Sequence, residues 1–170
     1  TKCRAGVVGL GKIGALNEAE SCQEWPVNTH AGGYRRFGKT QLAAACDINP
    51  KNRERFDEDW KIQKVYDRAE EMFSQEDLSL VSIATPVESH AQLCMLAVDA
   101  GVRAILCEKP FVSDCEKGKE VIQACREHGV VLAINHWMRW STTLRSIRDF
   151  LGRGGIGKVQ TLRCHYSKGA

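Results

Sequence analysis

A glycine pattern near the N-terminus combines residue types and a spacing that suit phosphate chemistry. It follows an apolar run and consists of Gly9-Leu10-Gly11-Lys12-Ile13-Gly14. The first glycine of such a pattern permits a tight turn, the second lets the backbone approach a pyrophosphate, and the third allows a helix to pack closely on a strand. Backbone N–H groups of the following helix start, around Lys12 and Ile13, would face the phosphates. Glycine-rich turns are common, so its position after an apolar strand is what predicts a dinucleotide site.

An acidic residue, Asp47, ends the second apolar run of the chain. A carboxylate there would accept hydrogen bonds from the adenosine ribose and repel a 2′-phosphate, which favours NAD over NADP. The acid is expected about 20 residues after the glycines, and here the gap is longer. We interpret residues 15–28, which include Pro26, as an insertion before the helix. A strand-end turn is the alternative role of Asp47, and the nearby Lys51 and Arg53 keep NADP as an alternative cofactor.

Two further residues with possible ligand contacts, Thr85 and Pro86, end a later apolar run. Open α/β sheets bind ligands beyond the carboxyl ends of their parallel strands, so Thr85 and Pro86 are predicted to form a wall of the cofactor site. His90 falls one helical turn into the helix that follows. Its side chain could contact the ligand, or it could cap the helix or pack in the core, and the sequence does not decide between these roles.

The elements that position these residues alternate along the chain, which is typical of a doubly wound α/β fold with a parallel Rossmann sheet. Strands are predicted over residues 4–9, 41–47, 65–66, 78–84, 103–107 and 130–134. Helices are predicted over residues 28–37, 50–60, 87–100, 113–128 and 142–151. Ser113, with Glu116 three residues on, predicts a capping box for the fourth helix.

A different pattern follows the turn at residues 152–155. Residues 158–167 alternate polar and apolar side chains, which predicts a strand of another sheet with one wet face. We therefore expect an NAD(P)-binding Rossmann domain over residues 1–155. Residues 156–170 are expected to begin a second domain.

Composition favours an ordinary globular protein over a nucleic-acid-binding, membrane or metal-binding one. The 170 residues are 43% apolar and 26% charged with a net charge of +3, which is ordinary for a globular protein and too small to predict nucleic-acid binding. No apolar run approaches the roughly 18 residues of a membrane span, and no secretory leader pattern is present. The eight cysteines show no C-x-x-C pair. We expect reduced structural thiols, no metal site, no membrane partner and a cytoplasmic location.

The sequence resembles the Gfo/Idh/MocA family (glucose–fructose oxidoreductase, inositol dehydrogenase and rhizopine catabolism) over essentially all of its length. The resemblance rests on residues 9–14, Asp47, Thr85-Pro86 with His90, Glu108-Lys109-Pro110 and Gly157-Lys158-Val159. It implies a Rossmann domain followed by a larger open-sheet α/β domain that binds substrate. It also implies reversible hydride transfer between NAD(P) and a hydroxyl carbon of a sugar, an inositol or a related polyol, in a homo-oligomer.

The resemblance also assigns residues. It implies that Lys109 lies near the nicotinamide and the substrate hydroxyl, where a cation polarises the reacting oxygen and relays a proton. A surface lysine in a turn is the alternative. Glu108 is expected to contact the nicotinamide ribose or to orient Lys109. Asn135 and Arg139 are expected to line the mouth of the site.

The family's acid–base histidine belongs to a D/N-x-x-x-H motif of the second domain, and neither His128 nor His165 fits that motif. We therefore expect this chain to be the cofactor-binding part of an oxidoreductase, inactive alone. The alternative is a dinucleotide-binding sensor or scaffold without catalysis. Lys109 argues against that alternative, because a sensor needs no cation at the hydride-transfer position.

Overall fold

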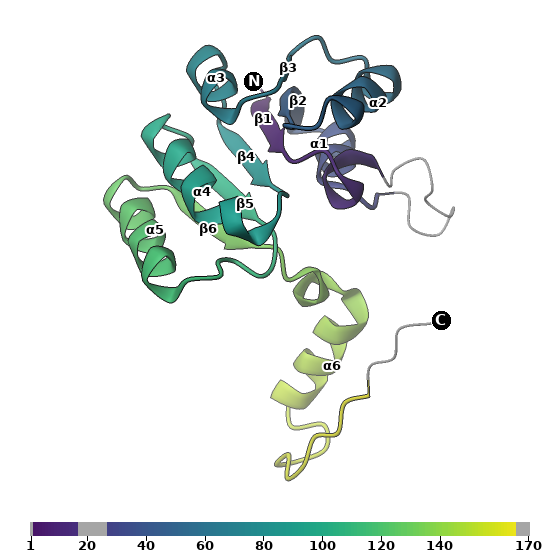
Figure 1. Ribbon diagram of the computed structural model, residues 1–170. Helices are drawn as coiled ribbons and strands as arrows, with labels where there is room; N and C mark the ends of the chain where they lie inside the picture. The colour runs from purple at the N-terminus through teal and green to yellow at the C-terminus, as the bar shows by residue number, and fades with distance from the viewer. Residues whose placement is uncertain (1, 17–26, 166–170) are drawn as a thin grey trace. The chain divides into compact units, whose positions relative to one another are not determined.

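A single parallel sheet organises the first part of the chain in the computed structural model, which describes residues 2–16 and 27–165. Its six strands lie in the order β3-β2-β1-β4-β5-β6 (Figure 1). They are β1 Cys3–Val8, β2 Thr40–Cys46, β3 Val65–Tyr66, β4 Leu80–Ile83, β5 Ala104–Cys107 and β6 Val131–Ile134. All five neighbouring pairs are parallel. This order is that of the dinucleotide-binding Rossmann fold, so the predicted fold is confirmed.

The described residues also form six α-helices and three short helical turns, of which the last helix and the last turn follow β6. The helices are α1 His30–Arg36, α2 Pro50–Trp60, α3 Ala69–Gln75, α4 His90–Asp99, α5 Cys115–Glu127 and α6 Thr142–Gly152. The turns are η1 Lys12–Leu16, η2 Val87–Ser89 and η3 Trp137–Trp140. Helix α3 and turn η3 were not predicted, because short helical elements show little helical period in a sequence. The helix start expected around Lys12 is the short turn η1.

Side-chain caps fix where several helices begin. Asn49 accepts a hydrogen bond from the backbone N–H of Lys51 at the start of α2. At the start of α5 the Asp114 carboxylate accepts from the N–H groups of Glu116 and Lys117. The predicted cap at Ser113 is therefore wrong by one residue. Serine and aspartate cap helices about equally well, so two adjacent polar residues leave the exact start ambiguous in the sequence.

Two buried clusters pack on the two faces of the sheet. Phe56 and Trp60 of α2 pack with Ala31 and Tyr34 of α1 against Ala5, Val7 and Ala45. The other cluster joins Met72 of α3, Cys94 of α4 and Val121 of α5 to Val8, Val81, Ile83 and Ile105. Successive strand residues point to opposite faces, so β1 supplies Val7 to one cluster and Val8 to the other.

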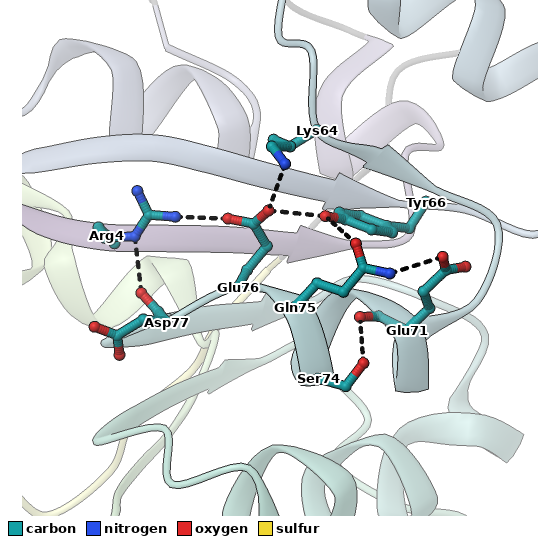
Figure 2. A network of polar contacts seen from close by, with 8 residues as sticks. All are labelled: Arg4, Lys64, Tyr66, Glu71, Ser74, Gln75, Glu76 and Asp77. Carbon is teal, nitrogen blue, oxygen red and sulfur yellow. Dashed lines mark hydrogen bonds and ion pairs between the residues drawn. The ribbon is translucent and has the colours of Figure 1, made fainter.

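A polar network fastens the end of α3 to the sheet (Figure 2). The Glu76 carboxylate forms ion pairs with Arg4 at 2.6 Å and Lys64 at 3.5 Å, and it accepts a hydrogen bond from the Tyr66 hydroxyl at 2.8 Å. Burial and the Glu76 carboxylate raise the pKa of Tyr66 to about 12. We call Arg4, Lys64, Tyr66 and Glu76 the Glu76 network.

The contacts divide the chain into two compact units, residues 1–135 and 136–170. The second unit contains η3 and α6. Its described residues 158–165 form no strand, so the predicted strand over 158–167 is wrong there, and residues 166–167 lie outside the described residues. Alternation alone does not make a strand, because a strand needs a hydrogen-bonded neighbour. The predicted boundary near residue 155 stays a prediction.

The predicted insertion over residues 15–28 stays a prediction, and it precedes α1, which begins at His30. Turn η1 begins at Lys12, directly after the second glycine of the pattern, so helical structure precedes the extra residues. Residues 17–26 lie outside the described part of the chain. Among the described helices, none is long and apolar enough to cross a membrane.

Candidate dinucleotide site

The glycine loop connects β1 to η1, and two of its glycines are required by the protein itself. Gly9 has a φ of +91°, and a Cβ atom there would lie 2.6 Å from the Ala84 carbonyl oxygen. A Cβ atom on Gly14 would overlap the Gly9 carbonyl oxygen. Gly11 differs, because a Cβ atom there would meet no described atom within 4 Å. The open space at Gly11 leaves room for a ligand against the backbone, beside the exposed side chains of Lys12 and Ile13.

Asp47, the residue after β2, ties that strand to the glycine loop. Its Oδ2 accepts hydrogen bonds from the Leu10 N–H at 2.7 Å and from Asn52 Nδ2 at 2.9 Å. Its Oδ1 accepts from the Asn49 N–H at 2.8 Å. The half-buried carboxylate therefore forms a strand-end turn and also braces the loop. Arg53 Nη1 donates to the Asp47 carbonyl oxygen at 2.8 Å, which brings a cation to the same edge.

Thr85 and Pro86 follow β4 at the carboxyl edge of the sheet, where Thr85 Oγ1 accepts from Ser89 Oγ at 2.7 Å. The His90 ring is 1% exposed. Its Nε2 lies 2.8 Å from the Thr85 carbonyl oxygen, and its Nδ1 lies 3.0 Å from that of Pro110. Both ring nitrogens are engaged with the backbone. This geometry favours the core role of His90 over a direct ligand contact, and it ties the β4 end to the β5 end.

Glu108, Lys109 and Pro110 follow β5. The Lys109 side chain is exposed, whereas Glu108 is 9% exposed. Glu108 Oε1 lies 3.0 Å from His30 Nε2 and accepts from Asn135 Nδ2 at 2.5 Å, while Oε2 accepts from the Lys109 N–H at 3.2 Å. Burial acts to raise the pKa of Glu108, but the hydrogen bonds from His30 and Asn135 outweigh it and lower that pKa to about 2. Glu108 is thus ionised and held in place.

Sequence reasoning missed three residues that extend this arrangement. His30 Nδ1 lies 2.8 Å from Ser82 Oγ, and Ser82 Oγ lies 2.6 Å from the Tyr34 hydroxyl. All three are buried, and burial raises the pKa of Tyr34 to about 12. We call Tyr34, Ser82, His30, Glu108 and Asn135 the Glu108 network. The available signal was Ser82, a polar residue inside the apolar run of residues 78–84.

Arg139 is the one predicted site residue that belongs to the second unit, where its side chain is exposed. The other predicted residues follow the carboxyl ends of β1, β2, β4, β5 and β6, in the connecting loops, in turn η1 or at the start of α4. The positions of the two units relative to one another are not determined. A contact between Arg139 and the cofactor therefore stays a prediction.

These features define a class of protein, the Rossmann domains that bind dinucleotides at the carboxyl edge of the sheet. A family model described as an oxidoreductase family with an NAD-binding Rossmann fold (GFO_IDH_MocA) matches residues 3–136. The chain therefore belongs to the Gfo/Idh/MocA oxidoreductase family, as its sequence motifs predicted. The family description agrees with NAD as the predicted cofactor.

Several individual proteins are similar to this chain. The chain is 32% identical over 128 residues to D-apiose dehydrogenase of Paraburkholderia graminis, covering 75% of this chain and 34% of that protein. It is 28% identical over 158 residues to 1,5-anhydro-D-fructose reductase of Ensifer adhaerens, covering 93% and 46%. Among solved structures, an oxidoreductase from Agrobacterium radiobacter in complex with NAD+, L-tartaric acid and magnesium superimposes with a TM-score of 0.79 at 26% identity. The match covers 93% of this chain and 42% of that protein. The chain thus spans less than half of these relatives.

Proposed function

We propose that this chain is the cofactor-binding part of an NAD-dependent oxidoreductase that transfers a hydride between the nicotinamide and a hydroxyl carbon of a sugar, inositol or related polyol. The observation that carries the proposal is the convergence of two features at one edge of the sheet. The Asp47 carboxylate braces the glycine loop, and Lys109 stands exposed beside the ionised Glu108. The first feature suits a dinucleotide, and the second suits proton and charge transfer at a reacting oxygen.

The residues fit an NAD molecule in three respects. The space at Gly11 admits a pyrophosphate against the backbone, and the first N–H groups of η1 lack partners within the turn by helix geometry. The Asp47 carboxylate offers further lone pairs to the ribose hydroxyls. Thr85 and Pro86 would form the wall beside the nicotinamide half. NAD supplies the hydride acceptor or donor when it is bound.

Lys109 is the residue that we assign to catalysis. Its side chain is exposed at the end of β5, and its backbone N–H donates to Glu108 Oε2. An ammonium group held there stabilises negative charge that develops on a substrate oxygen and hands over or receives its proton. Relatives named as sugar dehydrogenases and reductases support the substrate class. The substrate-binding residues, a homo-oligomeric assembly and a cytoplasmic location belong to the same proposal for the full-length protein.

Dinucleotide titrations test the cofactor assignment. We expect NADH to bind the chain more tightly than NADPH, measured by calorimetry or nicotinamide fluorescence. Asp47→Ala should weaken NADH binding about tenfold, because it removes charged hydrogen bonds worth about 1.5 kcal/mol or more. Asp99→Ala, which changes an exposed carboxylate at the far end of α4, is the matched control and should leave binding unchanged.

Two results would contradict the proposal in different ways. Tighter binding of NADPH would mean that Arg53 or Lys51 captures the 2′-phosphate and that Asp47 does not select against it. A folded chain that binds neither dinucleotide would contradict the proposed cofactor site.

A further inference from the structure

The Glu108 network runs from the buried face of α1 to the carboxyl edge of the sheet, and the proposed function leaves three of its members without a role. Tyr34 and His30 come from α1, and Ser82 comes from the middle strand β4. These three are at most 8% exposed, and each consecutive pair of groups lies within 3.0 Å. Buried polar side chains in a sheet core are costly unless they are satisfied, so a continuous network of this kind is a specific feature.

The network has a defined direction when the imidazole is neutral. Glu108 can only accept while it is ionised, so His30 Nε2 must carry the proton that faces it. His30 Nδ1 then accepts from the Ser82 hydroxyl, and Ser82 Oγ accepts from the Tyr34 hydroxyl. Every hydrogen bond points toward Glu108. Asn135 donates to the same carboxylate oxygen.

With the His30 ring neutral, the donors around Glu108 stabilise its negative charge without cancelling it. A neutral ring, a side-chain amide and a backbone N–H each stabilise the carboxylate, but none brings a full positive charge. The network thus presents one net negative charge at the end of β5.

A dinucleotide must pass close to this charge. In a doubly wound sheet the two nucleotide halves lie on either side of the point where the strand order reverses, here between β1 and β4. The glycine loop and Asp47 assign the adenosine half to β1 and β2. The other half then extends over β4 and β5, toward Glu108. That half changes charge during hydride transfer, because the oxidised nicotinamide ring is positive and the reduced ring is neutral.

We propose that His30 is a positioning residue of the cofactor site, which holds the Glu108 carboxylate in place and sustains its negative charge so that the site favours NAD+ relative to NADH. This inference rests on the proposed function, since it concerns the same site. It gives α1 a role in the preference for the oxidised over the reduced cofactor, whereas Asp47 bears on the choice between NAD and NADP. His30 acts through Glu108 and needs no contact with the cofactor.

The test is the ratio of the NAD+ and NADH dissociation constants, measured for variants of the chain by calorimetry. His30→Leu removes the donor to Glu108, and the ratio should shift about tenfold toward NADH, because one charged hydrogen bond is lost. His30→Gln keeps an N–H that can reach Glu108, and it should restore most of the wild-type ratio. Glu108→Gln removes the charge but keeps the shape, and it should shift the ratio at least as far as His30→Leu.

Tyr66→Phe is the matched control. Like His30→Leu, it removes a buried donor to a glutamate, here the Tyr66 hydroxyl of the Glu76 network, so stability should fall while the NAD+ to NADH ratio stays at the wild-type value. If His30→Leu and Glu108→Gln weaken both cofactors equally, the network is merely structural and the proposal is overturned.

A second measurement uses the free chain and separates this proposal from the cofactor assignment. Nitrogen-15 NMR should find the His30 ring as the Nε2–H tautomer, and a doubly protonated ring or an Nδ1–H tautomer would overturn the direction of the network. Failure of both dinucleotides to bind a chain that has the expected tautomer would overturn the proposed function and this inference with it. Binding with an equal shift of both affinities would overturn the inference alone.

Discussion

Glu76 and Glu108 are both buried glutamates, but their partners differ in charge. Glu76 precedes β4 and is paired with the cations Arg4 and Lys64 as well as the Tyr66 hydroxyl (Figure 2). Glu108 follows β5, and its carboxylate receives hydrogen bonds from side chains and a backbone N–H that include no lysine or arginine. Both carboxylates are satisfied, so the difference between them lies in the net charge that remains.

In our proposal, that difference separates a structural carboxylate from one that serves the cofactor site. The two cations more than offset the charge of Glu76, so no negative charge remains and the Glu76 network mainly fastens α3 and β3 to β1. With the His30 ring neutral, the charge at Glu108 is stabilised by dipoles and stays negative, which suits the proposed site for a positively charged ring. Burial and hydrogen-bond satisfaction alone do not distinguish the two networks.

The largest expected effect is on the pH dependence of folding stability, because the ionised Glu108 stabilises the folded chain. Its pKa falls from 4.5 to about 2 in the folded chain. A lowered folded pKa stabilises the protein above the unfolded pKa, and the stabilisation is lost as the pH falls through 4.5 toward 2. The full effect is about 3 kcal/mol at neutral pH, of which about 2 kcal/mol should be lost by about pH 3.

Urea unfolding of the wild-type chain and Glu108→Gln measures this effect. The difference between the two free energies of unfolding should shrink by about 2 kcal/mol between about pH 6 and pH 3. Other carboxylates titrate in both proteins and cancel in the comparison. A difference that does not change with pH would mean that Glu108 is not held ionised, and the contrast with Glu76 would fail.

Removal of the charge at Glu76 should have a smaller effect, of a different kind. Glu76→Gln leaves Arg4 and Lys64 without their partner, but their side chains are 39% and 58% exposed, and water compensates part of the loss. We expect a loss of about 2 kcal/mol in the free energy of unfolding. The NADH affinity of the folded protein should be unchanged in calorimetry, and a changed affinity would show that the Glu76 network also serves the cofactor site.

The sequence predicted the parts of this site that depend on local order. The glycine loop and Asp47 stand at strand ends, and in a parallel sheet those ends share one edge, so their proximity follows from the element order. His30 was not predicted, because its partners Ser82 and Glu108 are 52 and 78 residues away in the chain. Which face of α1 meets β4 depends on packing, which no local spacing encodes.

The one predicted strand that failed has a related cause. Residues 158–165 alternate as a half-buried strand does, yet the described residues give them no strand partner. Alternation reports which side chains prefer burial, whereas a strand also needs a neighbouring backbone to pair with. The strands of the sheet were predicted well because they are short continuous apolar runs, as is typical of parallel sheets that helices cover.

The smallest expected effect compares the outer ends of the two networks. Tyr34→Phe and Tyr66→Phe each remove one buried hydroxyl, and each should cost about 1 kcal/mol in the free energy of unfolding. Only Tyr34→Phe weakens the donors that point toward Glu108, and two intervening groups attenuate its influence, so we expect about a twofold shift of the NAD+ to NADH ratio toward NADH. Tyr66→Phe should leave that ratio unchanged. Equal ratios in the two variants would mean that polarisation does not travel beyond His30, and cofactor selection would then depend on the contacts of Glu108 with His30 and Asn135 alone.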